Sequence, residues 1–186
     1  KRLLSTILFF GVMLVAYASS VNIVLPKKAT NRVEYAAEYL QKKLLQQGFA
    51  VSVTKNGKAD KNSECKVYLS ISKNTASLKK EGFEITTTVK QSKKGAITNI
   101  SIVGNDGTGC IYACNELAEQ IKKNGISKLP SSVKDAPEMV LRGGCIGVQK
   151  PYLLPGRMVY EYPYTPELFP WFYDKQHWIE YLDMLV

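Results

Sequence analysis

Histidine is the scarcest catalytic residue type in this chain of 186 residues, which contains only His177. Cysteine is sparse too, and Cys65, Cys110, Cys114 and Cys145 match no metal-binding spacing. Because structural zinc sites are closed sets of Cys and His ligands, the sequence predicts no metal site. Cys114 falls on the apolar face of a predicted helix and is expected to be a small buried hydrophobe. A disulfide that involves Cys65 or Cys145 stays open.

A cofactor motif is missing as well. Residues 104–110 read Gly-Asn-Asp-Gly-Thr-Gly-Cys, where a predicted strand ends in a Gly-rich turn and a helix begins. Such a turn can cradle phosphate at a helix N-terminus, but the Lys-Ser/Thr ending of a P-loop is absent. The favoured interpretation is a tight strand-to-helix connection in which glycine lets two backbones approach closely. We therefore expect no cofactor.

Acidic residues are outnumbered: the chain has 16 Asp and Glu against 25 Lys and Arg, a formal net charge of +9. A basic surface can indicate nucleic-acid binding. Here no basic helix or aromatic platform gathers the lysines, so we interpret them as solvated faces and predict no nucleic-acid partner. They occur as scattered pairs at Lys27-Lys28, Lys42-Lys43, Lys79-Lys80, Lys93-Lys94 and Lys122-Lys123.

Residues 1–18 hold the apolar run Leu3–Val15, preceded by Lys1-Arg2 and followed by the small-residue sequence Ala16-Tyr17-Ala18. These are the three parts of a secretory signal, and we expect cleavage after Ala18. A membrane anchor is the alternative, but about 16 residues fall short of the ~20 that span a bilayer. The mature protein is therefore expected to be secreted or periplasmic, without membrane insertion after signal removal.

The pattern of residues 19–135 predicts a small α/β (α+β) sandwich. Alternating and helical hydrophobic patterns occur in the order β-α-β-β-β-β-α, which predicts a mostly antiparallel or mixed sheet with two helices on one face. Asn31 and Glu34 are placed to form a capping box on the first helix. Expected strands cover 21–25, 49–54, 66–72, 82–89 and 96–103, a hairpin turn covers 90–95, and the helices run from residue 31 to Gly48 and over about 108–123.

Residues 136–186 predict the start of a second domain after a linker over Ser127–Ala136. The apolar run Met139–Leu141 reads as a strand, and a helix from about Asp174 carries a stripe of Trp178, Tyr181, Leu182 and Leu185. One strand and one helix cannot close a core, so we expect these residues to be the opening of a larger domain. His177 lies beside the stripe without an identifiable catalytic partner and is expected to be structural.

Tyrosine, phenylalanine and tryptophan alternate with proline between Tyr152 and Trp171. Proline favours an extended chain here and opposes a helix. Aromatic faces on an extended loop suit stacking on the apolar faces of sugar rings. Alternatively, these rings pack the loop onto the second domain and the linker, and both interpretations stay open.

The Gly-rich turn and the segments around it resemble the accessory domain that precedes the barrel in family 20 β-hexosaminidases and, similarly, in family 67 α-glucuronidases. The resemblance rests on the strand that enters the turn, on Tyr112-Ala113 and Leu117 in the next helix, and on Pro137 and Arg142-Gly143 after a linker. It covers residues 21–186 and implies that residues 136–186 form the first βα unit of a truncated (β/α)8 barrel. The family 20 strand usually continues through two apolar residues to Asp, whereas this chain has Gly147.

The resemblance implies an exported glycoside hydrolase that acts on an oligosaccharide or glycan, most like a β-N-acetylhexosaminidase. It also implies that Arg142 grips hydroxyls of the terminal sugar, for which the planar donors of a guanidinium are suited. Alternatively, Arg142 pairs with a neighbouring carboxylate. No catalytic residue is assigned, because the catalytic carboxylates are expected beyond residue 186. An α-glucuronidase-type hydrolase and a non-catalytic glycan-binding protein are the alternative functions.

Overall fold

The computed structural model describes residues 19–72, 78–92, 95–144, 165–167 and 169–185. The predicted signal at 1–18 lies outside them. The strands are β1 (Ser20–Val24), β2 (Ala50–Thr54), β3 (Cys65–Ile71), β4 (Phe83–Ser92), β5 (Gly95–Gly104) and β6 (Ser132–Asp135). The helices are α1 (Asn31–Gln46), α2 (Gly107–Asn124), the 3-10 turn η1 (Ile126–Lys128), α3 (Pro170–Tyr173) and α4 (Lys175–Met184).

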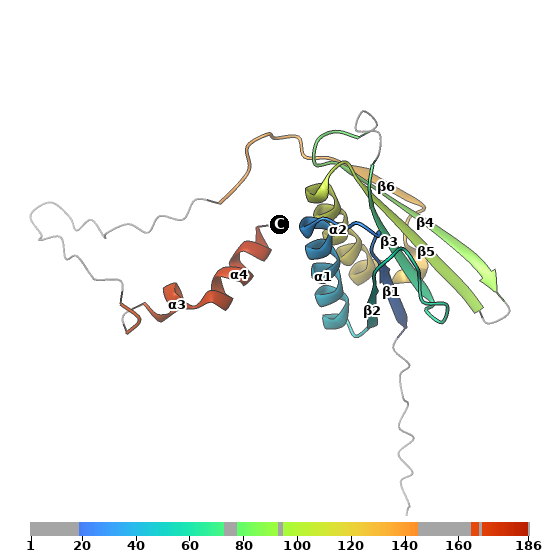
Figure 1. Ribbon diagram of the computed structural model, residues 1–186, viewed down its shortest axis with the longest axis horizontal. Helices are drawn as coiled ribbons and strands as arrows, with labels where there is room; N and C mark the ends of the chain where they lie inside the picture. The colour runs from blue at the N-terminus through green and yellow to red at the C-terminus, as the bar shows by residue number, and fades with distance from the viewer. Residues whose placement is uncertain (1–18, 73–77, 93–94, 145–164, 168, 186) are drawn as a thin grey trace, which may run out of the picture.

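The strands form one mixed sheet in the order β2-β1-β3-β5-β4-β6 (Figure 1). Neighbours from β2 to β5 are parallel, whereas β4 is antiparallel to both β5 and β6. The predicted mixed sandwich is therefore confirmed. The predicted turn at 90–95 is too long, because β4 and β5 stay paired as far as Ser92 and Gly95.

Helices α1 and α2 lie side by side on one face of the sheet and enclose the core (Figure 1). The core is apolar because alternate strand residues and one stripe of each helix point into this layer. Its largest fully buried members include Ile23 and Ile100 of the sheet, Leu40 and Leu44 of α1, and Leu117 of α2.

Helix α1 ends as its sequence predicts. Gly48 has φ +87°, a left-handed conformation that glycine adopts without a steric penalty. The Gly48 N–H donates to the Leu45 carbonyl at 3.0 Å and the Phe49 N–H to the Leu44 carbonyl at 3.1 Å. This pair of bonds is a Schellman motif, and it satisfies two carbonyls at the helix end.

The capping box predicted at the start of α1 is not formed. Thr30, not Asn31, is the N-cap residue, and its side chain makes no capping hydrogen bond. The Glu34 carboxylate instead pairs with Lys55 at 3.0 Å. Glu34 therefore pairs with a lysine from a distant loop and not with the backbone N–H of the N-cap residue, which is its partner in a capping box.

The predicted linker over 127–136 is wrong in part, because it contains η1 and β6. Strand β6 pairs with β4 from Phe83↔Asp135 to Thr86↔Ser132 and forms one edge of the sheet. Only Val133 of its four residues is even half-buried. A four-residue edge strand of this kind lacks the alternation that would reveal it in the sequence.

The predicted strand at Met139–Leu141 is also wrong. These three residues are in irregular structure and are 72%, 97% and 91% exposed. A lone strand leaves its backbone groups unpaired, and none of the described strands pairs with this segment. The first βα unit of a barrel accordingly stays a prediction.

A short helix, α3, begins at Pro170, where the sequence predicted extended chain only. Proline is tolerated there because the first residue of a helix needs no N–H partner. The expected terminal helix is present as α4, capped by the Asp174 carboxylate, which accepts from the Gln176 N–H at 2.8 Å. Within the described ranges, every helix is too short or too polar to cross a lipid bilayer.

Candidate functional site

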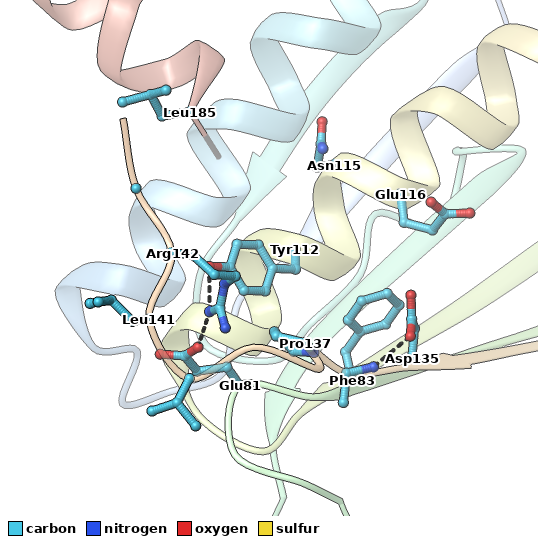
Figure 2. A pocket seen from close by; sticks show the side chains of 13 residues that line it. Glu81, Phe83, Tyr112, Asn115, Glu116, Asp135, Pro137, Leu141, Arg142 and Leu185 are labelled. Atoms are coloured by element: carbon cyan, nitrogen blue, oxygen red, sulfur yellow. Dashed lines mark hydrogen bonds and ion pairs between the residues drawn. The ribbon is translucent and has the colours of Figure 1, made fainter. Parts of the chain in front are cut away.

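An open groove of about 580 Å³ lies beside the N-terminal half of α2 (Figure 2). We call it the α2 groove. The turn before β4, the exposed side of α2, the chain that follows β6, and the end of α4 form its walls. Its lining is Glu81, Phe83, Tyr112, Asn115, Glu116, Asp135, Ala136, Pro137, Val140, Leu141, Arg142, Gly143 and Leu185.

The Gly-rich turn positions the first wall of the groove. A Cβ added at Gly109 would lie 2.3 Å from the Gly82 carbonyl oxygen, and one added at Gly107 would lie 2.6 Å from Cβ of Arg32. These distances are far below van der Waals contact, so only glycine allows the backbones to approach this closely. The tight connection expected from the sequence is what the geometry shows.

Asp106 fastens the same turn to α2. Its carboxylate accepts the Gly109 N–H at 2.9 Å, which caps the helix, and the Glu81 N–H at 3.0 Å. An anion at a helix N-terminus is stabilised by the free N–H groups and the helix dipole. Here the chain supplies that anion itself, so the turn serves packing and not phosphate binding.

Arg142 lies in the α2 groove and not at the end of a strand. Its guanidinium donates to the Glu81 carboxylate and to the Tyr112 hydroxyl at 3.2 Å (Figure 2). It also donates to the Met139 carbonyl. The guanidinium carbon also lies 5.7 Å from the centre of the Tyr112 ring, within cation–π range. Hydrogen bonds to Tyr112 and Glu81 raise the pKa of Arg142 above its ordinary value, so the side chain stays charged.

These contacts match the alternative in which Arg142 pairs with a carboxylate. They do not test whether Arg142 also binds sugar, and that role stays a prediction.

The backbone of Glu81 has an unusual conformation: its φ is +59°, in the left-handed region that non-glycine residues rarely adopt. The bond from its N–H to Asp106 maintains this conformation.

The other carboxylates of the groove are engaged with their own elements. Glu116 accepts from the Gln120 amide at 2.7 Å, and Asp135 accepts from the Ala136 N–H at 2.7 Å. The described lining contains no His, Cys, Ser or Lys. Over the described ranges, moreover, no group of His, Cys, Asp and Glu could hold a metal ion. What the groove does show is a junction, in which Arg142 of the chain after β6 bonds to Glu81 and Tyr112 of the sandwich.

Three cysteine thiols are buried in the core, where none of them can act as a nucleophile. Cys65, Cys110 and Cys114 are free and at most 1% exposed, so the open question of a disulfide at Cys65 is answered in the negative. Burial raises the pKa of Cys65 to about 12 and that of Cys110 to about 11, and it raises that of Cys114 well above its ordinary value. A protonated, buried thiol is inert. Cys145 lies outside the described residues.

Trp171 and His177 belong to an aromatic cluster that joins α3 to α4. The Trp171 ring is centred 5.7 Å from that of His177 and 6.1 Å from that of Trp178, and the Trp178 indole N–H donates to the Phe172 carbonyl at 2.8 Å. These rings pack the short helix on the longer one, as one of the two interpretations expected. Tyr152, Tyr160, Tyr162 and Tyr164 lie outside the described residues.

A protein-family model described as glycosyl hydrolase family 20, domain 2, matches residues 11–136. The chain belongs to this family. The match covers the sandwich, including the Gly-rich turn and β6, and so confirms the resemblance to the accessory domain of family 20. Two walls of the α2 groove, the turn before β4 and the exposed side of α2, therefore belong to family 20 domain 2, whereas Arg142 lies beyond the match.

A solved structure of a GH138 enzyme targeting pectin rhamnogalacturonan II is also similar. It is 41% identical over 89% of this chain, with a TM-score of 0.63. Because residues 11–136 are only about two thirds of the chain, this similarity extends outside the domain 2 match. The chain spans 22% of the length of that structure. No curated protein matches the chain.

Sequence reasoning found Arg142, Tyr112 and the Gly-rich turn, but it missed Glu81. Nothing local distinguishes Glu81 from the other charged residues of the Lys79-Lys80-Glu81 run. Its role follows from the fold, which brings the turn before β4 against the start of α2. The contacts of α4 with α1, through Asp183, were missed for the same reason.

Proposed function

We propose that the full-length protein is an exported glycoside hydrolase that acts on a pectic glycan, and that this chain supplies its accessory domain and the beginning of its catalytic domain. The observation that carries the proposal is the 41% identity to a pectin-targeting GH138 enzyme, which extends outside the accessory domain. Identity at this level across a domain junction supports a shared catalytic domain more strongly than a shared accessory domain alone.

A β-N-acetylhexosaminidase is the second candidate, and the domain 2 match supports it. Two points weigh against it. The match ends at residue 136, before the predicted catalytic part, and Gly147 stands where the family 20 strand usually has Asp. Accessory domains are combined with more than one catalytic domain, so function has to be argued from the catalytic part.

The deciding experiment compares substrates for the purified full-length enzyme. Rhamnogalacturonan II fragments and an aryl N-acetyl-β-glucosaminide are incubated with the enzyme, and released sugars are separated by chromatography. We expect release from the pectic fragments only. Release of N-acetylhexosamine alone would favour the second candidate, and no release from either would favour a glycan-binding protein.

The 186-residue chain is the matched negative control in the same assay. We expect no turnover by this chain, because the α2 groove lacks a free acid–base pair and a retaining or inverting glycosidase needs two positioned carboxyl groups. Turnover by the chain alone would contradict the placement of the catalytic residues beyond residue 186.

A further inference from the structure

We propose that the face of the sheet on the side away from α1 and α2 is a glycan-binding surface, which holds an acidic polysaccharide while the catalytic domain acts on it. We call this surface the open sheet face and define it as the outward side chains of β3, β5, β4 and β6. The class of glycan, a polymer of uronic acids, rests on the proposed function.

The open sheet face is unusual because it belongs in part to parallel strands. Parallel sheets ordinarily have both faces covered. Helices α1 and α2 cover one face here, and the described residues place no helix on the other (Figure 1). The loop after β2 covers β1 on that side, where the buried Asn22 side chain accepts the Asp60 N–H at 2.9 Å. Strands β3 and β5 are parallel too, but Tyr68 and Ser101 on their outward side remain accessible to solvent.

The outward side chains are polar, which distinguishes this face from one that packs on protein. Along β3, Val67 and Leu69 belong to the core. The residues that alternate with them, Lys66, Tyr68 and Ser70, point outward because successive side chains of a strand face opposite sides. The outward residues of β4 and β6 likewise include no aliphatic side chain, and those on this face are confined to β5. A second protein layer would need an apolar centre to pack on.

A row of hydroxyl groups crosses the open sheet face. The register aligns four residues on neighbouring strands: Tyr68, Ser101, Thr86 and Ser132. Because neighbouring strands lie about 4.8 Å apart, the row is about 14 Å long, which is enough for more than one sugar ring. Each hydroxyl can both donate and accept a hydrogen bond, as the hydroxyls of a sugar can. Tyr68 adds a ring whose apolar face suits stacking.

The open sheet face is also basic. Lys66, Lys90 and Lys134 lie on it, and Glu84, which is paired with Lys134 across the strands, is the one carboxylate among its outward residues. Within the described part of the chain, Lys66 and Lys90 form no ion pair, so both ammonium groups are available to a ligand.

This charge is complementary to that of a pectic glycan. The similar GH138 enzyme targets a rhamnogalacturonan. Galacturonic acid, the sugar acid in that name, has a carboxyl group that is ionised at neutral pH. A chain of such sugars presents both carboxylates for the lysines and hydroxyls for the row, and electrostatic complementarity of this kind favours the acidic polymer over a neutral one.

A nucleic acid is the alternative polyanion. It is disfavoured because proteins that bind single strands stack successive bases on several aromatic side chains. Tyr68 is the only aromatic residue among the outward side chains of the described parts of β3, β5, β4 and β6.

The position of the face fits an anchor and not a catalytic site. Arg142 contacts Tyr112 of α2, in the layer on the other side of the sheet. A glycan on the open sheet face therefore does not compete with one that binds near Arg142. A second binding surface on the same protein raises the effective concentration of a long polymer at the catalytic domain.

The test measures the binding of polygalacturonate to the full-length enzyme by affinity gel electrophoresis. Lys66→Gln with Lys90→Gln removes two charges from the open sheet face. Lys122→Gln with Lys123→Gln, at the exposed end of α2, is the matched control with the same loss of charge. We expect the dissociation constant to rise about fivefold in the first double variant, the scale of two exposed ion pairs, and to be unchanged in the control.

Two further measurements separate the ring from the charge. Tyr68→Leu preserves apolar bulk but removes the ring and its hydroxyl, and it should weaken polygalacturonate binding about threefold. Fully methyl-esterified polygalacturonate, which carries no carboxylates, should bind the wild type more weakly than the acidic polymer. Added salt should weaken binding of the acidic polymer, because it screens exposed charges.

Unchanged affinity in the Lys66 and Lys90 variant would overturn the proposal, and so would an equal loss in the control or equal binding of the esterified polymer. Tighter binding of single-stranded DNA than of polygalacturonate, lost in the same variant, would assign the face to nucleic acid and overturn it too. The readout is binding without turnover. Failure of the substrate assay with this binding intact would refute only the proposed function, whereas unaltered binding in the variant with sugar release intact would refute only the surface.

Discussion

At the scale of single residues, close backbone packing governs the Gly-rich turn. Gly104, Gly107 and Gly109 each face another part of the chain at a distance that excludes a Cβ. The contacts join the end of β5, the start of α1 and the turn before β4. These glycines therefore set the position of Glu81, and through it the position of Arg142.

Gly109→Ala should destabilise the sandwich by about 1–3 kcal/mol, the usual cost of forcing extra atoms into a packed site. The new Cβ would meet the Gly82 carbonyl oxygen, which is backbone and cannot rotate away. Urea unfolding followed by circular dichroism measures the change. Gly143→Ala is the control, since nothing lies within 4 Å of its added Cβ, and it should be nearly neutral. Equal stability of the two variants would contradict the packing argument.

The buried thiols predict a loss of stability in alkali. Unfolded thiols ionise near pH 9, whereas those of the folded protein stay protonated to about pH 11 at Cys110 and about 12 at Cys65. The unfolded state therefore loses protons first as the pH rises. The free energy of unfolding should be insensitive to these groups below about pH 8 and should fall above pH 9 by about 1.4 kcal/mol per pH unit for each thiol.

Cys65→Ala separates this effect from other titrations. The variant should be less stable at pH 7, because it leaves a cavity, but its stability should fall less steeply between pH 9 and 11. Urea unfolding over this pH range gives both slopes. Parallel curves for the variant and the wild type would show that the thiol does not contribute.

At the scale of elements, Asp106 joins β5, α2 and the turn before β4. Asp106→Ala removes the cap of α2 and leaves the Glu81 N–H without its acceptor. We expect a loss of about 1–2 kcal/mol in the free energy of unfolding. Asp60→Ala is a suitable control, because the Asp60 carboxylate accepts the Asn62 N–H within an exposed loop. A loss in Asp106→Ala no larger than in the control would refute the capping role.

At the scale of the whole molecule, the predicted sugar contact of Arg142 can be separated from its pairing with Glu81. In the full-length enzyme, Arg142→Ala should lower kcat/KM more than tenfold if the guanidinium holds substrate, because a ligand of the transition state is lost. Glu81→Gln removes the charged partner of Arg142 but keeps the guanidinium in the enzyme, and kcat/KM should stay within a fewfold of wild type if the guanidinium itself binds the sugar. Equal losses in both variants would show that Arg142 acts only through its pairing with Glu81.

The sequence by itself determined most of the sandwich. The period of the hydrophobic pattern predicted five strands and two helices, and Gly48 and Gly125 predicted where the helices end, each to within a few residues. These signals succeed because each acts within a single element. Gly104 to Gly109 also marked the correct turn. The resemblance carried by Tyr112, Leu117 and Pro137 led to the correct domain family.

Only the tertiary structure decided β6, the pairing of Arg142 with Glu81, and the contact of Asp183 with Tyr35. In each case the partner lies tens of residues away and contributes no periodic signal. Strand β6 exists because β4 offers an open edge, and Arg142 is paired because the turn at Glu81 is held against α2. Such pairings depend on proximity in space, which no local pattern of residues encodes.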